Sequence, residues 1–215
     1  MYREIIVLAK SSKHSEYCLA GVDTTTGEWI RPISSNIVNE GSVPIIDVTY
    51  RDGNQVQILD MIKIKLLSHK PTISQPENYL YDSNFKWEKT GQSSLAELVK
   101  YRGYDQAKQI FYNNGKEVSE EELSGQPSLL FVNVKDSCIF IKTFFDGNRR
   151  LQFNFTYNGM KYQYFKISDK LILTKFTNIS DGNYNYRDDL PVVFSLTDKF
   201  KKTDQYYKMV AQMFY

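Results

Sequence analysis

The chain has 215 residues, a hydrophobic content of 41%, and 27 basic against 25 acidic residues, for a formal net charge of +2. This length fits one large domain or two small ones, and the composition predicts a folded core and excludes a disordered chain. No apolar run approaches the roughly 18 residues of a membrane span. Many nucleic-acid-binding proteins have a strong basic excess, and this chain does not, so its net charge alone does not indicate that class.

The N-terminal run, MYREIIVLAK, carries charge at Arg3 and Glu4 and leads directly into a strand-like pattern, which argues against a signal peptide. Two cysteines, Cys18 and Cys138, lie far apart without a CxxC pair. This spacing fits buried thiols in a reducing compartment better than a disulfide scaffold or a zinc site. We therefore expect a soluble, cytoplasmic protein without a membrane partner.

Short strands dominate the first third of the sequence. Three runs of strand-forming residues are separated by turn-forming ones: 4–10, 16–23 and 27–33. Further along, Ile62, Ile64 and Leu66 alternate with Lys63 and Lys65, which is the period of a half-buried strand. About five strands in this part of the chain are enough to close a small barrel.

The middle of the sequence changes to helical spacing. Apolar residues between Leu95 and Val99 recur at helical intervals, and Ser94 and Glu97 predict a capping box at the start of the helix. Gly103 is expected to break this helix, and a second short helix is expected to end near Asn114-Gly115. We interpret this segment as a helical connector between two β units.

A hairpin is the clearest local signal in the last third. Asn158-Gly159 is the preferred pair for a two-residue type I′ turn. The turn predicts three cross-strand pairs: Tyr157–Met160, Phe155–Tyr162 and Phe153–Tyr164. These residues and Leu151 then share an apolar face that we assign to the core. The opposite, polar face carries Gln152, Asn154, Thr156, Lys161 and Gln163.

Several motifs also follow one another in a characteristic order. Cys18, Ala20 and Gly21 precede the Trp-Ile-Arg-Pro motif of residues 29–32, and an Asp60 strand precedes SQPEN. KWEKTG, PSLLFV, FTYNGMKYQYFKISD, FSLTDKF and YYKMVAQMF complete the order. Over essentially the whole chain this order resembles the bacterial dual OB-containing domain family. One departure is the stretch KPTIS, which separates His69 from Gln75 by more residues than the family pattern does.

The resemblance implies a fold that agrees with the strand–helix–strand pattern. The expected fold is mainly β with minor α: two OB-like small β-barrels joined by a short helical connector. The first barrel, with its QPEN loop, is expected at 1–90, the connector at 91–126 and the second barrel at 127–215. The resemblance further implies a nucleic-acid-binding or nucleotide-binding role in a prokaryotic defence or DNA-modification context.

Trp29 and Arg31 form the first candidate site. They lie two residues apart on a predicted strand, so their side chains project to the same face. On an exposed groove, the indole would stack on a base and the guanidinium would contact a phosphate. On an inward face, Trp29 would belong to the core and Arg31 would need a buried carboxylate, because an unpaired buried guanidinium is costly. The sequence leaves both alternatives open.

The segment SQPENYLY is the second candidate site. Gln75, Glu77 and Asn78 carry hydrogen-bonding groups of the kind that read base edges, and Tyr79 offers a ring for stacking. The alternative is a loop that covers one end of the barrel and satisfies buried backbone groups. Lys13, in the polar stretch after the first strand, is a further candidate for ligand contact.

Signs of catalysis are weak. The sequence has no Gly-rich phosphate loop, no Gly-x-Ser-x-Gly and no His-Glu-x-x-His. Asp60, His69 and Glu77 are of the ligand types that hold magnesium or manganese, but a structural role for Asp60 is the simpler interpretation.

We therefore predict a non-catalytic protein that binds single-stranded nucleic acid or a nucleotide, modified nucleotides included, without a cofactor or metal. One alternative is an interaction subunit that docks a partner enzyme encoded nearby. The other is a metal-dependent enzyme that acts on nucleic acid.

Overall fold

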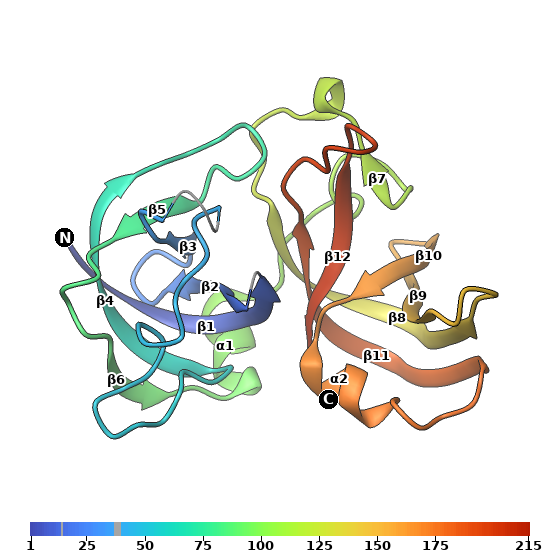
Figure 1. Ribbon diagram of the computed structural model, residues 1–215, viewed down its shortest axis with the longest axis horizontal. Helices are drawn as coiled ribbons and strands as arrows, with labels where there is room; N and C mark the ends of the chain where they lie inside the picture. Colours follow the sequence, from blue (N-terminus) through green and yellow to red (C-terminus); the bar gives the residue numbers. More distant parts are fainter. Residues whose placement is uncertain (14, 37–39) are drawn as a thin grey trace. The chain divides into compact units, whose positions relative to one another are not determined.

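Strand pairing organises the chain into two units, Met1–Gly103 and Tyr104–Tyr215, in a computed structural model that describes residues 1–13, 15–36 and 40–215 (Figure 1). The boundary between the units falls inside the segment predicted as the connector, 91–126. Each unit is described by itself below.

Five strands of the first unit form a closed ring. They are β1 (Tyr2–Lys13), β2 (Glu16–Asp23), β3 (Trp29–Ile33), β4 (Asp60–His69) and β5 (Asn78–Tyr81). The hydrogen-bonded order is β1–β2–β3–β5–β4, and β4 pairs back to β1. These pairings are antiparallel except β3–β5, which is parallel. A further strand, β6 (Glu88–Gln92), pairs with β4.

Alternation along the strands fills this ring with apolar side chains. On β4, Ile62, Ile64 and Leu66 are fully buried, whereas Lys63 and Lys65 between them are partly exposed. This confirms the half-buried strand predicted from the sequence. The long connection from β3 to β4 adds further apolar side chains to the same core, among them Val43, Val48 and Val56.

The second unit repeats the ring with the same connections. Its strands are β8 (Leu129–Thr143), β9 (Arg149–Tyr157), β10 (Met160–Ile167), β11 (Gly182–Leu196) and β12 (Tyr206–Met213), and β7 (Glu117–Val118) pairs with β12. The order is β10–β9–β8–β11–β12, and a parallel pairing of β10 with β12 closes it. In both units the third strand therefore pairs with the fifth in parallel. The two rings confirm the expected pair of small barrels.

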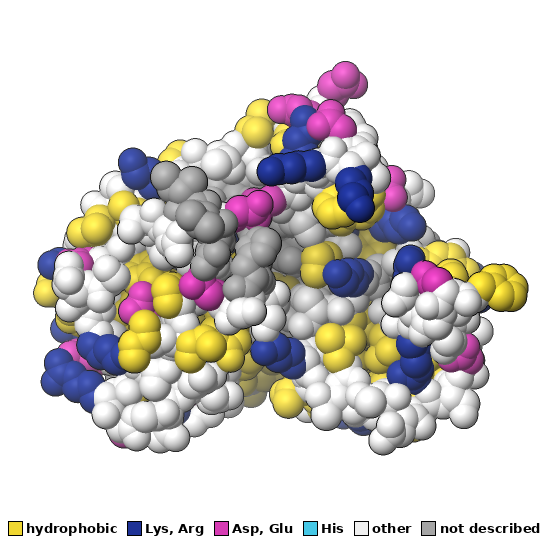
Figure 2. All heavy atoms as spheres, in the orientation of Figure 1, with side chains coloured by type: hydrophobic (Ala, Val, Ile, Leu, Met, Phe, Trp, Pro, Cys, Tyr) yellow, Lys and Arg dark blue, Asp and Glu magenta, His cyan; other side chains and the backbone are white. Residues whose placement is uncertain are grey.

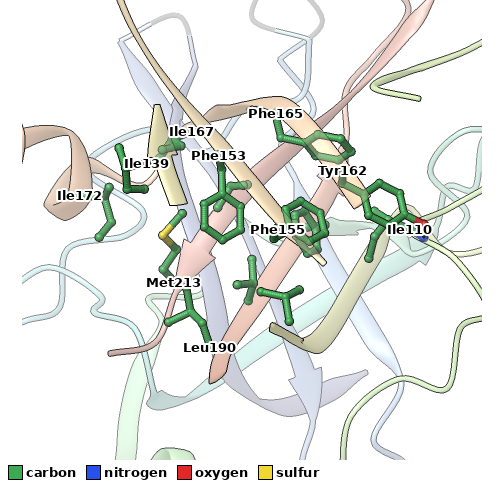
Figure 3. Packing of buried hydrophobic residues seen from close by; sticks show 14 of the residues in the cluster. Ile110, Ile139, Phe153, Phe155, Tyr162, Phe165, Ile167, Ile172, Leu190 and Met213 are labelled. Carbon is green, nitrogen blue, oxygen red and sulfur yellow. Dashed lines mark hydrogen bonds between the residues drawn. The ribbon is translucent and has the colours of Figure 1, made fainter. Parts of the chain in front are cut away.

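A helix between the third and fourth strands of the second ring, α2 (Lys170–Lys175), contributes to its core. The carboxylate of Asp169 caps this helix by accepting hydrogen bonds from the backbone N–H groups of Leu171 and Ile172, at 2.9 and 3.3 Å. Ile172 is thereby held in the core cluster that also contains the rings of the β9–β10 hairpin (Figure 3).

The β9–β10 hairpin confirms most of the predicted pairing. Asn158 and Gly159 form the turn, Tyr157 pairs with Met160, and Phe155 pairs with Tyr162. The rings of Phe155 and Tyr162 stack with centroids 5.0 Å apart, and Figure 3 shows them among the buried aromatic side chains.

The third predicted pair is wrong, because a β-bulge lies between Tyr162 and Phe165. Phe153 pairs with Phe165, not with Tyr164. The bulge shifts the alternation by one residue, so Phe165 is fully buried and Tyr164 is 44% exposed. Tyr164 has a positive φ of 63°, a conformation that a non-glycine residue rarely adopts.

The first helix of the predicted connector is confirmed. Helix α1 (Leu95–Arg102) begins with the expected capping box of Ser94 and Glu97 and ends at Gly103, which has a φ of 73°. It belongs to the first unit. No helix within the described ranges is long and apolar enough to cross a membrane.

The predicted second helix, ending near Asn114-Gly115, does not form. Residues 104–107 have no regular structure and residues 108–116 adopt bends and turns; β7 and a short 3₁₀ turn, η1 (Glu120–Glu122), follow. The buried Lys208 ammonium on β12 donates to the carbonyl oxygen of Ile110 at 2.7 Å and to Asn113 Oδ1 at 2.9 Å. These contacts with β12 outweigh a weak local helix propensity.

The bulge generates a matched pair of stability predictions. Phe165→Ala removes a fully buried ring and is expected to lower the free energy of unfolding by about 3–5 kcal/mol. Tyr164→Ala removes a partly exposed ring and is expected to cost less than about 1 kcal/mol. Chemical denaturation followed by circular dichroism measures both. Equal losses would contradict the bulge.

Candidate functional site

The parallel pairing of β3 with β5 brings most of the predicted site residues together. Arg31 lies opposite Asn78, and Pro32 lies opposite Tyr79. The loop of residues 70–77, which connects β4 to β5, holds Gln75 and Glu77 next to this pairing. Two strands that lie more than forty positions apart in the sequence, β3 and β5, thus bring these residues together in one part of the first barrel.

A buried ion pair between Arg31 and Glu77 lies at the centre of this group. Both Nε and Nη2 of Arg31 contact Oε1 of Glu77, at 3.2 and 3.0 Å, and the side chains are 12% and 4% exposed. The backbone N–H of Arg31 also donates to the carbonyl oxygen of Glu77 at 2.9 Å. Of the two alternatives for Arg31, the geometry matches the one in which a buried carboxylate receives the guanidinium.

Trp29 is covered as well, with 7% of its surface exposed. The guanidinium of Arg102, from the last turn of α1, lies 5.3 Å from the centroid of its ring. Arg102 Nε also donates to the carbonyl oxygen of Gly27 at 2.7 Å. The sequence pattern did not single out Arg102, although a cation in the last turn of a helix is a common arrangement.

The amides of the loop bond to each other. Asn78 Nδ2 donates to Gln75 Oε1 at 3.1 Å, and both residues are buried. The backbone N–H of Gln75 donates to Thr72 Oγ1 at 3.0 Å. A ring nitrogen of His69, Nε2, lies 2.6 Å from the carbonyl oxygen of Pro76. These hydrogen bonds join residues of the loop to each other and to its flanking strands, so they fix the conformation of the loop.

Two stacked rings form an exposed surface in this part of the first barrel. His69 on β4 lies opposite Tyr79 on β5, and their ring centroids are 4.5 Å apart at an interplanar angle of 25°. His69 is exposed and Tyr79 is partly exposed, with the exposed Lys70 next in the chain. The extra KPTIS residues thus form a loop that returns the chain to His69. The sequence pattern alone did not reveal this ring pair.

The second tyrosine on β5 is buried. Tyr81 is 3% exposed, and its hydroxyl donates to Asp47 Oδ2 at 2.5 Å. Burial and then the Asp47 carboxylate raise the pKa of Tyr81 well above its ordinary value. Tyr81 therefore remains a neutral hydrogen-bond donor in the core, whereas Tyr79, which also packs against this core, keeps part of its surface exposed.

The carboxylates considered as metal ligands are bonded elsewhere. Asp60 accepts from the Tyr50 hydroxyl at 2.7 Å and from the backbone N–H of Gln57 at 2.9 Å, and it lies 2.5 Å from Lys89 Nζ. Glu77 binds Arg31. Within the described part of the chain, no group of three His, Cys, Asp or Glu residues could hold a metal ion.

Lys13 ends β1, opposite Glu16. Its side chain lies outside the described residues, as does His14.

Comparisons with known proteins bear on the whole chain. A family model described as "Dual OB-containing domain" matches residues 3–213. Among solved structures, the chain is similar to the one titled "Crystal structure of p204 HINb domain", with 12% sequence identity and a TM-score of 0.32. That alignment covers 98% of this chain and 96% of the other. No curated protein matches the sequence.

Removing the carboxylate of Glu77 tests the importance of the buried pair. Glu77→Gln removes the negative charge that faces the buried Arg31 guanidinium and is expected to cost about 3–5 kcal/mol of unfolding free energy. Lys65→Ala is the matched control, since it breaks a more exposed pair with Asp82 at 2.8 Å and is expected to cost at most about 1 kcal/mol. Similar melting curves for Glu77→Gln and wild type would contradict a stabilising role.

Proposed function

The chain belongs to the dual OB-containing domain family, and from this membership and the geometry of its first unit we propose that it binds single-stranded nucleic acid or a nucleotide. OB folds bind oligonucleotides on the face of their second and third strands and with the loops between strands one and two and strands four and five. In the first unit, the loop between strands four and five is 70–77, and the third strand is β3. The predicted residues Trp29, Arg31, Gln75 and Glu77 lie on these two segments.

The stacked pair of His69 and Tyr79 is the observation that supports this function best. An unpaired base can stack on an exposed aromatic ring, and such stacking contributes about 1–3 kcal/mol per base. Lys70 and, in this proposal, Lys13 supply positive charge for the phosphates. A single strand of a few nucleotides is the ligand that uses both features.

The buried residues act in this proposal as positioning residues. The Arg31–Glu77 pair fixes the end of the loop to β3, and the Gln75–Asn78 hydrogen bond fixes its interior. Trp29 is buried beside the guanidinium of Arg102 and supports β3 from the side of α1. A loop held in this way loses little conformational entropy when a ligand binds, which favours affinity.

Docking of a partner enzyme is the second candidate function. Leu67 and Ile73, on β4 and in the loop that follows it, are 56% and 53% exposed, which favours a protein partner in this part of the first barrel. The resemblance described for the sequence further implies a setting in prokaryotic defence or DNA modification, and the two separate cysteines favour the cytoplasm. We keep that setting as part of the proposal, with a non-catalytic role for the chain.

Fluorescence anisotropy with labelled strands tests the proposal. We expect wild type to bind an oligothymidylate or an oligouridylate about 15 nucleotides long more tightly than a duplex of the same length. Tyr79→Ala is expected to weaken binding by about 5- to 150-fold, which is the loss of one stacked base.

Tyr101→Ala is the matched control, because Tyr101 is a 49% exposed tyrosine on α1 of the same unit. It is expected to bind like wild type. If wild type binds none of the three probes, the proposed function is wrong. If Tyr79→Ala binds like wild type, the assignment of the binding site to the stacked rings of His69 and Tyr79 is wrong.

A further inference from the structure

Positive charge gathers on two strands of the second unit, although the chain as a whole is nearly balanced. Strands β9 and β10 contain four basic residues, Arg149, Arg150, Lys161 and Lys166, and no Asp or Glu. The equivalent strands of the first unit, β2 and β3, contain Arg31 with two acidic residues, Glu16 and Asp23. The second ring therefore has a basic second and third strand, and the first ring does not.

Strand register places two of these cations, Lys166 and Arg150, in neighbouring rows of one face. Phe140 on β8 lies opposite Gln152 on β9, which lies opposite Lys166 on β10. In the neighbouring row, Lys142 lies opposite Arg150. The residues between them, such as Ile139, Ile141 and Phe153, are buried. Because strand side chains alternate between faces, the rows lie on the outer face of the barrel.

The β-bulge adds a second ring to this face. It turns Tyr164 outward, where its ring meets the edge of Phe140 with centroids 5.4 Å apart. Two amides of the same face bond to its backbone: Asn154 Oδ1 accepts from the N–H of Tyr164 at 2.7 Å, and Gln152 Nε2 donates to its carbonyl oxygen at 3.1 Å. Bulges commonly re-aim a side chain near a functional site.

The loop between β8 and β9 extends the same surface. Its Phe145 side chain is fully exposed, at 113% of the reference area. The neighbouring Phe144 ring lies 4.6 Å from the guanidinium of Arg150 and 5.4 Å from the ammonium of Lys142. On the face shown in Figure 2, dark blue Lys and Arg side chains lie among yellow hydrophobic ones over the second unit.

We propose that the outer face of β8, β9 and β10, with the loop of residues 144–148, is a second binding surface for an unpaired nucleic-acid strand. Hereafter this surface is called the basic aromatic face. It adds a site to the function proposed above and shares with it only the class of ligand. Phe145, Tyr164 and Phe140 offer rings for bases, and Lys142, Arg150 and Lys166 of the same face offer positive charge for phosphates.

A nucleic-acid strand matches this face better than an acidic peptide does. Cations alone would satisfy a peptide carboxylate, and a fully exposed phenylalanine would then have no partner. An unpaired strand carries both flat bases and phosphates, which correspond to the exposed rings and the cations of this face. Binding is expected to depend on salt, because each phosphate contact releases counterions.

The test compares two double variants of the full-length chain. Phe145→Ala/Arg150→Ala removes a ring and a cation from the basic aromatic face. The matched control, Lys116→Ala/Leu171→Ala, removes an exposed cation and an exposed apolar side chain elsewhere in the second unit. Each is titrated by anisotropy with an oligothymidylate and an oligouridylate about 15 nucleotides long, at several salt concentrations, after its melting temperature is measured.

We expect the first variant to bind at least about 10-fold more weakly than wild type, with an unchanged melting temperature. Its slope of log affinity against log salt is expected to fall by about 0.7 for the phosphate contact that is lost. The control variant is expected to keep the wild-type affinity and slope. The preferred oligonucleotide identifies the strand as DNA or RNA.

Three results would overturn the inference. The first is equal binding by both double variants and wild type. The second is displacement of the strand by polyglutamate as readily as by unlabelled strand, since that would show a site for any polyanion. The third is no binding by wild type, which would remove the proposed function as well. If Tyr79→Ala binds like wild type and Phe145→Ala/Arg150→Ala binds more weakly, the first-unit site is wrong and the basic aromatic face is supported.

Discussion

The parallel pairing between the third and fifth strands closes each barrel, and the rest of each unit depends on it. Parallel neighbours cannot be joined by a tight turn, so these strands come from distant parts of the sequence. A buried carboxylate lies beside each pairing. Glu77, just before β5, binds Arg31 on β3. Asp169, just after β10, accepts from the N–H of Met213 and from Gln212 Nε2 on β12, at 2.9 and 2.8 Å.

In the first unit, this closure also determines which groups reach the solvent. The polar residues of the loop bond to β3 and to each other, so they are largely consumed in holding its shape. The stacked rings of His69 and Tyr79 remain at the edge, with the exposed Lys70 beside them. A rigid polar interior under an exposed aromatic edge is a favourable arrangement for binding a flexible strand, since the protein then loses little entropy.

Local patterns predicted the elements whose causes are local. Alternation on β4, the capping box of α1 and the Asn158-Gly159 turn each depend on a few neighbouring residues, and each is confirmed. The Tyr164 bulge was missed, because strict alternation contains no information on an extra residue. The helix predicted after Gly103 does not form because the contacts of that segment with Lys208 on β12, which are distant in the sequence, determine its conformation.

The candidate site was predictable as a set of residues but not as an arrangement. The motifs pointed to Arg31 and to Glu77 separately, and only the fold shows that the two bind each other across 46 positions. The contact between the rings of His69 and Tyr79 could not be predicted, because the loop between them is longer than in the family pattern. On β9, the polar face was predicted correctly from the turn, but its rows of rings and cations depend on the register with β8.

Hydrogen–deuterium exchange of the full-length protein, with and without a saturating oligothymidylate about 15 nucleotides long, tests the central claim most directly. It reports where the strand binds without any substitution. We expect slower exchange in residues 67–81, around the stacked rings of His69 and Tyr79, and in residues 140–152, on the basic aromatic face. Unchanged exchange in both segments, while the strand is shown to be bound, would contradict that claim.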